Sequence, residues 1–461
     1  MKIMENVNNL IPFPLSVTSM VFGVLPWGSF KNLSGKLSSL YTGILLIIFS
    51  SSVMLFAWKC ANASTNNANR KSLKEIRKLW IDYLMQVYPA IRIVNSLPAF
   101  YISFICMERV YSKIIKFIHI SDVMMGYGKF DTTFNRKQFW YGLIIYLLIA
   151  VAICPFKAVM LLNISKELLK SLNLTTLLLF PVSYFGNFAV ICVEMQFACI
   201  CRAIYLRLAL INLRLKTLID EVRTRRLSVL LDVPSSQIVK SELDRKVVFV
   251  NRYFSKSEKV KILWKKLKMN RRKAMSKVLP MLVNCAPKTN FSFQDDHDLL
   301  KELISLRLSY RHLHLCLKSV QDMFGIHLLF SFCSLFIMIV FFIYFEFYHK
   351  QSESKIFHFF YLICGWLLHL ILRFNLLLWQ AYQTTQEAEK IEEILPLAMG
   401  RQLDQSVKDE LQMFSIEVSC SDWKITGWNF FVLKPELFVW TVGGVATYLG
   451  IIVNLDVNSS N

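Results

Sequence analysis

The chain ends in "TYLGIIVNLDVNSSN" (447–461), where a run of apolar residues closes at Leu455 and six residues follow. Asn458 begins the pattern Asn-Ser-Ser, which accepts an N-linked glycan only on the lumenal or extracellular side of a membrane. An apolar helix with such an acceptor directly behind it is typical of a helix that crosses a membrane. We therefore predict that the chain ends outside the cell.

The composition indicates that this helix has companions. Of the 461 residues, 54% are hydrophobic and 18% are charged, and the mean hydropathy is +0.42. A soluble protein usually carries about 25% charged residues. The apolar residues gather in runs close to the roughly 20 residues that a helix needs to cross a bilayer core. We predict an all-α polytopic membrane protein whose seven transmembrane helices are 37–58, 83–107, 138–160, 174–200, 322–346, 356–383 and 435–455.

Two signals orient these helices. With the N-terminus inside, the cytoplasmic segments hold about 40 Lys and Arg residues and the outer segments about 10, as the positive-inside rule requires. The glycan acceptors at Asn62, Asn163, Asn173 and Asn458 then all lie outside. The chain thus divides into a cytoplasmic segment (1–36), helices 1 to 4 (37–200), cytoplasmic extensions with a basic loop (201–321), helices 5 and 6 (322–383), a cytoplasmic anchor segment (384–434) and the last helix with its tail (435–461).

Several helices are predicted to continue well past the membrane. The helix from Leu299 to Glu346 would be about 70 Å long, while a bilayer core is only about 30 Å thick. The helix that begins at Ile356 is expected to reach Leu395, where Pro396 would stop it. Apolar residues share one face beyond the fourth helix, at Ile204, Leu208, Ile211, Leu215 and Leu218. We therefore expect a helical bundle, with long helices, on the cytoplasmic side.

A heptad-like seam leads into the fifth helix. Apolar residues recur there at alternating spacings of three and four, at Leu303, Leu306, Tyr310, Leu313, Leu317, Val320 and Phe324. We predict that this seam holds copies of the chain together below the membrane.

Other function classes find little support in the sequence. The formal net charge of +21 is concentrated in cytoplasmic segments, with a basic run at 256–277 that suits anionic membrane lipids better than nucleic acid. Motifs of metalloproteases, serine hydrolases and phosphate-binding loops are absent from the sequence, so we expect no enzyme, no cofactor and no metal site. The eleven cysteines form no C-x-x-C pair and most lie in apolar segments, which is typical of packing residues.

The final helix resembles that of insect gustatory receptors. That family closes on Thr-Tyr, five mostly apolar residues and Gln-Phe, and here Thr447 and Tyr448 are followed by the same spacing, with Asn454 and Leu455 in the last two places. The stretches PLSVTSMVFGVLPW (14–27) and FGIHLLF (324–330) are also similar to the family. The resemblance extends to length, helix count and the long loop between the fourth and fifth helices.

The resemblance implies a ligand-gated, non-selective cation channel in the plasma membrane of a sensory neuron. Members assemble as tetramers, with the last helix of each subunit lining one central pore and the cytoplasmic extensions packed together. A homotetramer is therefore expected, with other gustatory receptor subunits as possible partners. The implied pore and gate residues are Thr447, Tyr448, Ile451, Asn454 and Leu455.

The resemblance also places a ligand pocket in the outer half of each subunit. Aromatic residues with a few polar tips suit a small organic ligand, although ordinary aromatic packing explains any single residue as well. The candidate pocket residues are Tyr88, Arg92, Tyr184, Phe341, Tyr344, Phe345, Tyr361 and Trp366. Because few acidic or amide groups accompany them, we expect a bitter organic compound rather than a sugar, whose hydroxyl groups would need polar partners.

Ionisable residues inside the predicted membrane helices are further candidates, since charge in a bilayer usually has a function. Arg92, Glu194 and Arg373 lie farthest from the helix ends. Two alternative functions remain at this point. A G-protein-coupled receptor would need the opposite orientation, and a secondary transporter often shows internal repeats with broken helices, which this sequence lacks.

Overall fold

The structure is a computed structural model. The described residues are 19, 40–45, 47–52, 54, 91, 93–102, 107–126, 174–231, 296–349, 356–399 and 403–460. Their main elements are α5 (Met107–Met124), α7 (Leu174–Leu231), α10 (Asp296–His349), α11 (Ile356–Met399), α12 (Gln405–Ser419), β1 (Thr426–Gly427), β2 (Phe431–Val432) and α13 (Glu436–Ser460). The predicted helical class is confirmed for this part of the chain, with one small hairpin added.

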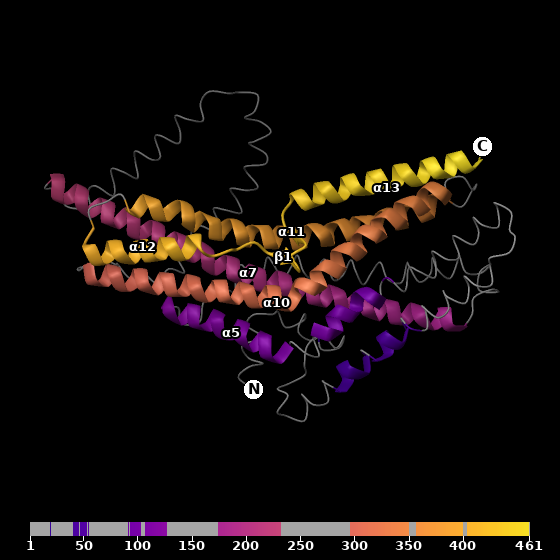
Figure 1. The fold of residues 1–461 in the computed structure, drawn as a ribbon, viewed down its shortest axis with the longest axis horizontal. Helices are drawn as coiled ribbons and strands as arrows, with labels where there is room; N and C mark the ends of the chain where they lie inside the picture. Colours follow the sequence, from indigo (N-terminus) through magenta and orange to yellow (C-terminus); the bar gives the residue numbers. More distant parts are fainter. Residues whose placement is uncertain are drawn as a thin grey trace, which may run out of the picture.

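The long continuous helices are confirmed. α7, α10 and α11 have 58, 54 and 44 residues, and they run through both halves of the molecule (Figure 1). At 1.5 Å per residue, α10 is about 80 Å long, more than twice the thickness of a bilayer core. One end of each helix therefore lies far outside any membrane that the other end crosses.

Two helical segments of the described chain are long and apolar enough to cross a membrane, Phe185–Asp220 and His297–Val340. The predicted helix 138–160 lies outside the described residues, as do parts of 37–58 and 83–107. Seven spans, and their orientation, therefore stay predictions.

Five helices form a bundle at the end of the molecule where α12 lies. α5, α7, α10, α11 and α12 lie together there (Figure 1), and α10 contacts the other four. The predicted seam faces the interior of this bundle, since all of its residues from Leu303 to Phe324 are buried within a single chain. The prediction that the seam joins one copy to another is wrong, because its side chains already form the core of their own subunit.

The buried face of α7 follows the predicted spacing. Ile204, Leu208, Ile211 and Leu215 are buried, and α7 packs along α11 and α10. The predicted end of α11 needs a small correction, because the helix passes Pro396 and ends at Met399. Proline removes one backbone donor and strains the preceding turn, but so near the C-terminus the helix has only a single turn left to complete.

Helix α12 is fixed to α10 by ion pairs and aromatic contacts. Nε of Arg307 donates to Glu410 over 2.5 Å and its Nη1 to Glu417 over 3.3 Å. These carboxylates raise the pKa of the Arg307 guanidinium above its ordinary value, with the Glu410 hydrogen bond as the largest cause. The α12 face that packs inward consists of Val407, Leu411, Phe414 and Val418.

A hydrogen-bonded aromatic pair closes the same interface. Nε1 of Trp423 donates to the hydroxyl oxygen of Tyr310 over 2.5 Å, and the two ring centroids lie 5.1 Å apart. Burial raises the pKa of Tyr310 to about 12, so this phenol stays protonated at physiological pH. The segment behind α12 is thereby tied to the middle of α10.

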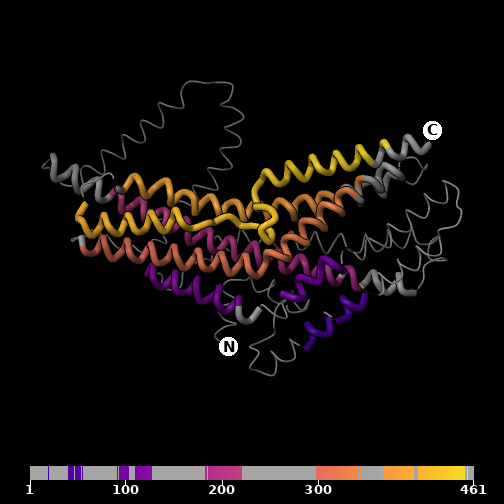
Figure 2. The backbone as a smooth tube through the Cα atoms, viewed as in Figure 1, coloured from indigo at the N-terminus to yellow at the C-terminus, as the bar shows by residue number. Residues whose placement is uncertain are grey.

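A two-stranded hairpin turns the chain from α12 into α13, as Figure 2 shows. Trp428 and Asn429 both have positive φ, at 47° and 62°, and the Phe430 amide donates to the Gly427 carbonyl over 3.0 Å. Two consecutive left-handed residues are the signature of a type I′ turn, which matches the twist of antiparallel strands. A Cβ atom on Gly427 would lie 2.5 Å from the Phe431 ring, so a larger residue there would displace that ring.

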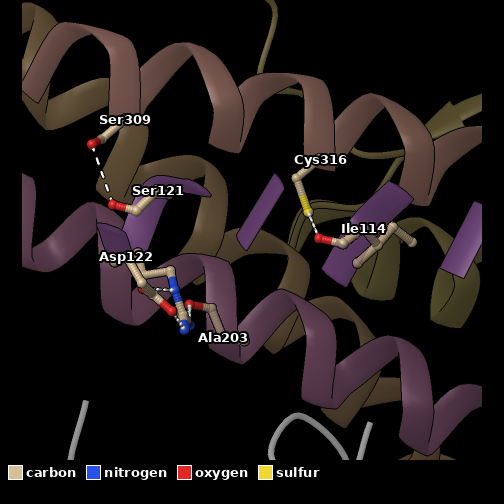
Figure 3. A network of polar contacts seen from close by, with 7 residues as sticks. Ile114, Ser121, Asp122, Ala203, Ser309 and Cys316 are labelled. Carbon is tan, nitrogen blue, oxygen red and sulfur yellow. Dashed lines mark hydrogen bonds and ion pairs between the residues drawn. The ribbon is translucent and has the colours of Figure 1, made fainter. Parts of the chain in front are cut away.

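Helix α5 joins the bundle through polar contacts with α7 and α10. Arg207 makes two hydrogen bonds of 2.7 Å to the two carboxylate oxygens of Asp122, and its Nη1 donates to the Ala203 carbonyl. On the α10 side, Ser309 donates to the Ser121 carbonyl and the Cys316 thiol to the Ile114 carbonyl (Figure 3). A planar guanidinium that binds both oxygens of a carboxylate fixes orientation as well as distance.

Replacing Leu313 by Ala tests the seam as the core of one subunit. Leu313 is 0% exposed, so we expect a loss of about 2–5 kcal/mol in the free energy of unfolding. Leu315→Ala is the matched control on the same helix, because that side chain is 36% exposed and its loss should cost well under about 1 kcal/mol. The measurement is thermal unfolding of the detergent-solubilised protein followed by size exclusion. Equal losses in the two variants would contradict this assignment.

Candidate functional site

Helix α13 leaves one complete side uncovered within a single chain. Thr447, Ile451 and Asn454 are exposed, and at 100° per residue Thr447 and Asn454 lie on the side of the helix opposite to Val445, which is buried. Trp440 shares this uncovered side and is 75% exposed. A helix with few charges and so much exposed surface needs other protein or lipid to cover it.

The other side of α13 faces α10. A Cβ atom on Gly444 would lie 3.2 Å from the Phe336 ring, so glycine allows the two helices to approach closely. The Tyr448 and Phe336 rings meet edge to face with centroids 6.2 Å apart. Of the predicted pore residues, Tyr448 therefore reaches α10, although it is 56% exposed, whereas Thr447 and Asn454 lie on the uncovered side. Ile451 is exposed too, but it follows Gly444 by seven residues and so lies at the border of the two sides. The side chain of Leu455 is outside the described residues.

The uncovered side of α13 is almost uncharged. The Thr447 hydroxyl donates to the Gly443 carbonyl one turn earlier, over 2.9 Å, so its proton is used within the helix. Among the described side chains on this side, the exposed Asn454 carries an amide group. A stripe of small, apolar and amide side chains has the chemistry of a wide pore wall without a charged filter.

The predicted pocket residues are placed only by their helices. Tyr184 lies on α7, Phe341, Tyr344 and Phe345 on α10, and Tyr361 and Trp366 on α11. These positions belong to the helix ends farthest from α12 (Figure 1). Their side chains are outside the description, as are Tyr88 and Arg92 altogether. The pocket therefore stays a prediction.

The structure does not test the predicted glycan acceptors either. Asn62, Asn163 and Asn173 lie outside the described residues. Asn458 lies within α13, which continues to Ser460 beyond the predicted helix end at Leu455. Glycosylation of these four residues therefore stays a prediction.

A buried polar network joins three long helices inside the apolar half of the molecule. Nε and Nη2 of Arg373, on α11, donate to the two carboxylate oxygens of Glu194, on α7, and the Nη2 bond is 2.6 Å long. The Ser331 hydroxyl, on α10, donates to the same carboxylate, and Arg373 also donates to this hydroxyl oxygen over 3.3 Å. The Arg373 and Glu194 side chains are only 3% and 0% exposed.

This network neutralises two of the three ionisable residues that the sequence analysis singled out. A charge at this depth is expensive unless it is paired and hydrogen-bonded. The pair cancels both charges and adds a serine as third partner, so it fixes α7, α10 and α11 relative to one another. Both residues were identified as candidates from the sequence, but their pairing was not, because 178 intervening positions carry no record of which helices become neighbours.

The comparison with known families decides the identity of the fold. The sequence profile of the 7tm chemosensory receptor family matches residues 13–459. The chain belongs to this family. The resemblance that the sequence analysis drew from the C-terminal motif is thus confirmed at the level of the receptor family, whose members are chemosensory receptors and not enzymes.

Solved structures support the same fold for this chemosensory receptor. It is similar to the insect olfactory receptor OR5 from Machilis hrabei in complex with eugenol, with a TM-score of 0.58, 11% identity, and coverage of 99% of this chain and 100% of the other. A second structure of OR5 from Machilis hrabei is similar with a TM-score of 0.56 and 12% identity. The match covers 96% of this chain and 97% of the other. The curated proteins compared with this receptor include no match.

Two elements of the receptor were missed by the sequence analysis. α12 could have been found from the spacing of Val407, Leu411, Phe414 and Val418, which marks one helical face. α5 is amphipathic as well. The segment that contains it was predicted to be cytoplasmic, but no helix was predicted there. Both helices pack on α10.

Replacing Arg373 by Met should destabilise the receptor strongly, because Glu194 is left buried without its partner. We expect a cost of about 3–5 kcal/mol, and we expect the double variant Glu194→Leu/Arg373→Met to recover most of it. The control is Arg311→Ala, which removes a 3.8 Å contact to Glu417 from a side chain that is 62% exposed and should cost at most about 1 kcal/mol. Thermal unfolding in detergent measures all three variants, and a double variant as unstable as the single one would contradict the pairing.

Proposed function

We propose that this receptor is a ligand-gated, non-selective cation channel of the gustatory type, which detects a small organic tastant at the plasma membrane. The observation that carries the proposal is the match to the chemosensory receptor family over residues 13–459. The resemblance of the final helix to gustatory receptors supports the finer assignment to taste. A G-protein-coupled receptor and a secondary transporter were the alternatives, and the family match argues against both.

The pore of the proposed channel is formed by α13 from each of four copies. The uncovered side of α13 supports this, because Thr447 and Asn454 are exposed there and Ile451 is exposed at its border. Four copies around an axis would enclose these residues and cover the apolar surface that one chain leaves exposed. In this arrangement Leu455 provides the apolar closure and Tyr448 supports the pore helix from the α10 side.

The ligand pocket is proposed between the outer ends of α7, α10 and α11, where Tyr184, Tyr344 and Trp366 are carried. OR5 from Machilis hrabei is described in complex with eugenol, which supports a small organic compound as the ligand of a receptor with this fold. The aromatic composition of the candidate positions favours a bitter compound over a sugar.

The subunit contacts of the proposed tetramer must lie elsewhere than the seam, whose side chains are buried within each subunit. Exposed apolar side chains on α12 (Met413 and Ile416) and on α13 supply surface for contact between copies, in homomers or with other gustatory receptor subunits. Membrane lipids cover the remainder of the apolar half.

Two experiments test this function at different levels. An epitope tag after Asn461 should be stained on intact cells, because the proposed topology puts the C-terminus outside; staining only after permeabilisation would contradict it. Whole-cell recording during a screen of alkaloids and sugars should give currents carried by Na⁺ and K⁺ alike in response to a bitter compound. Currents that respond only to sugars would overturn the ligand class, and the absence of ligand-evoked current from surface-expressed receptor would overturn the channel.

Variants of α13 test the pore directly. Asn454→Ala removes the amide that a passing ion would meet, so it should change conductance or ion preference, whereas Leu455→Ala should raise the current without ligand because it opens the apolar closure. Val442→Ala, an exposed position of the same helix off the Asn454 side, should leave both properties unchanged. Surface labelling must show equal expression of the variants. If Asn454→Ala and Leu455→Ala conduct like the parent, the pore does not lie along this side of α13.

A further inference from the structure

His327 is a buried imidazole that the chain itself does not satisfy. It lies on α10, it is 0% exposed, and neither of its ring nitrogens has a hydrogen-bonding partner among the described residues. A neutral imidazole carries one donor and one acceptor. Leaving such groups unpaired in the interior costs about 1–3 kcal/mol each, so buried polar groups nearly always bind protein or ordered water.

The imidazole lies beside the buried ion-pair network. Ser331 follows His327 by four residues, which places the two side chains on one face of α10. Ser331 contacts Glu194 and Arg373. The network that Ser331 shares with a carboxylate and a guanidinium therefore begins on the face of α10 that carries the imidazole.

We propose that His327, Ser331 and the Glu194–Arg373 pair form an internal hydration site, in which water bridges the imidazole to the network. Water fits because it both donates and accepts hydrogen bonds, and internal waters typically make about three of them to otherwise unsatisfied groups. The opposite charges of Glu194 and Arg373 cancel, so the site has no excess charge to attract an ion.

The described groups around His327 also give no metal site. The described residues contain no group of three His, Cys, Asp or Glu side chains placed to hold a metal ion. The site lies where α7, α10 and α11 meet, so its water links the three helices that extend from the apolar half into the bundle. The proposal rests on this geometry and does not depend on channel function.

Hydroxyl-radical footprinting of the full-length receptor in detergent tests the site. Brief X-ray irradiation turns bound water into hydroxyl radicals that oxidise the side chain beside it, and mass spectrometry locates the product. We expect oxidation of His327 at a rate comparable to that of the exposed His119. Phe324 and Phe332 are the matched controls, since both are buried on the same helix and carry oxidisable rings. They should stay protected.

Ser331→Ala gives the second measurement. It removes one of the groups that hold the water, so oxidation of His327 should fall severalfold while that of His119 stays unchanged. The proposal is overturned if His327 is as protected as Phe324 in the parent receptor, or if Phe324 and Phe332 are oxidised together with it, which would indicate opening of the helix. Unchanged oxidation of His327 in the Ser331 variant would also overturn it, because the water would then be bound elsewhere.

Discussion

The rest of this structure depends on the packing of three long helices. Each of them is longer than the thickness of a bilayer core. A chain inside a bilayer must satisfy its backbone polar groups internally, which favours helices. α7, α10 and α11 do not end where the apolar sequence ends, so the same three helices must pack against one another both in the apolar half and in the charged half. The places of α5, α12, the hairpin and α13 follow from this continuity, since all of them attach to α10.

The two halves stabilise the same helices by different interactions. In the bundle, the hydrophobic effect buries the seam, and partly exposed ion pairs such as Arg307 with Glu410 add orientation and little energy. In the apolar half, lipid is as apolar as leucine, so burial of leucine side chains contributes little to helix association. The completely buried Glu194–Arg373 pair matters more there, because removing either partner leaves a charge with no water to solvate it.

The hairpin between α12 and α13 shows how local backbone geometry redirects the chain. Trp428 has a left-handed backbone, which is uncommon for a bulky residue. Contacts on both sides hold this turn in place, with the Thr426 and Asn429 side chains hydrogen-bonded to each other and Gly325 of α10 packed near the Trp428 backbone. The direction in which α13 leaves the bundle, and hence which of its sides stays uncovered, depends on this turn.

The sequence by itself determined the helical class, the length of α10 and the faces that are buried, because hydrophobic periodicity reports directly on burial. The residues of the seam and the α7 face from Ile204 to Leu218 were predicted correctly for that reason. Periodicity does not report what covers a face, so only the tertiary structure decided that the seam closes its own subunit. It also decided that Glu194 meets Arg373 and that Tyr448 turns toward Phe336 while Asn454 turns away. Contacts of this kind depend on which helices become neighbours. The spacing of residues within one helix contains no information about which other helix lies beside it.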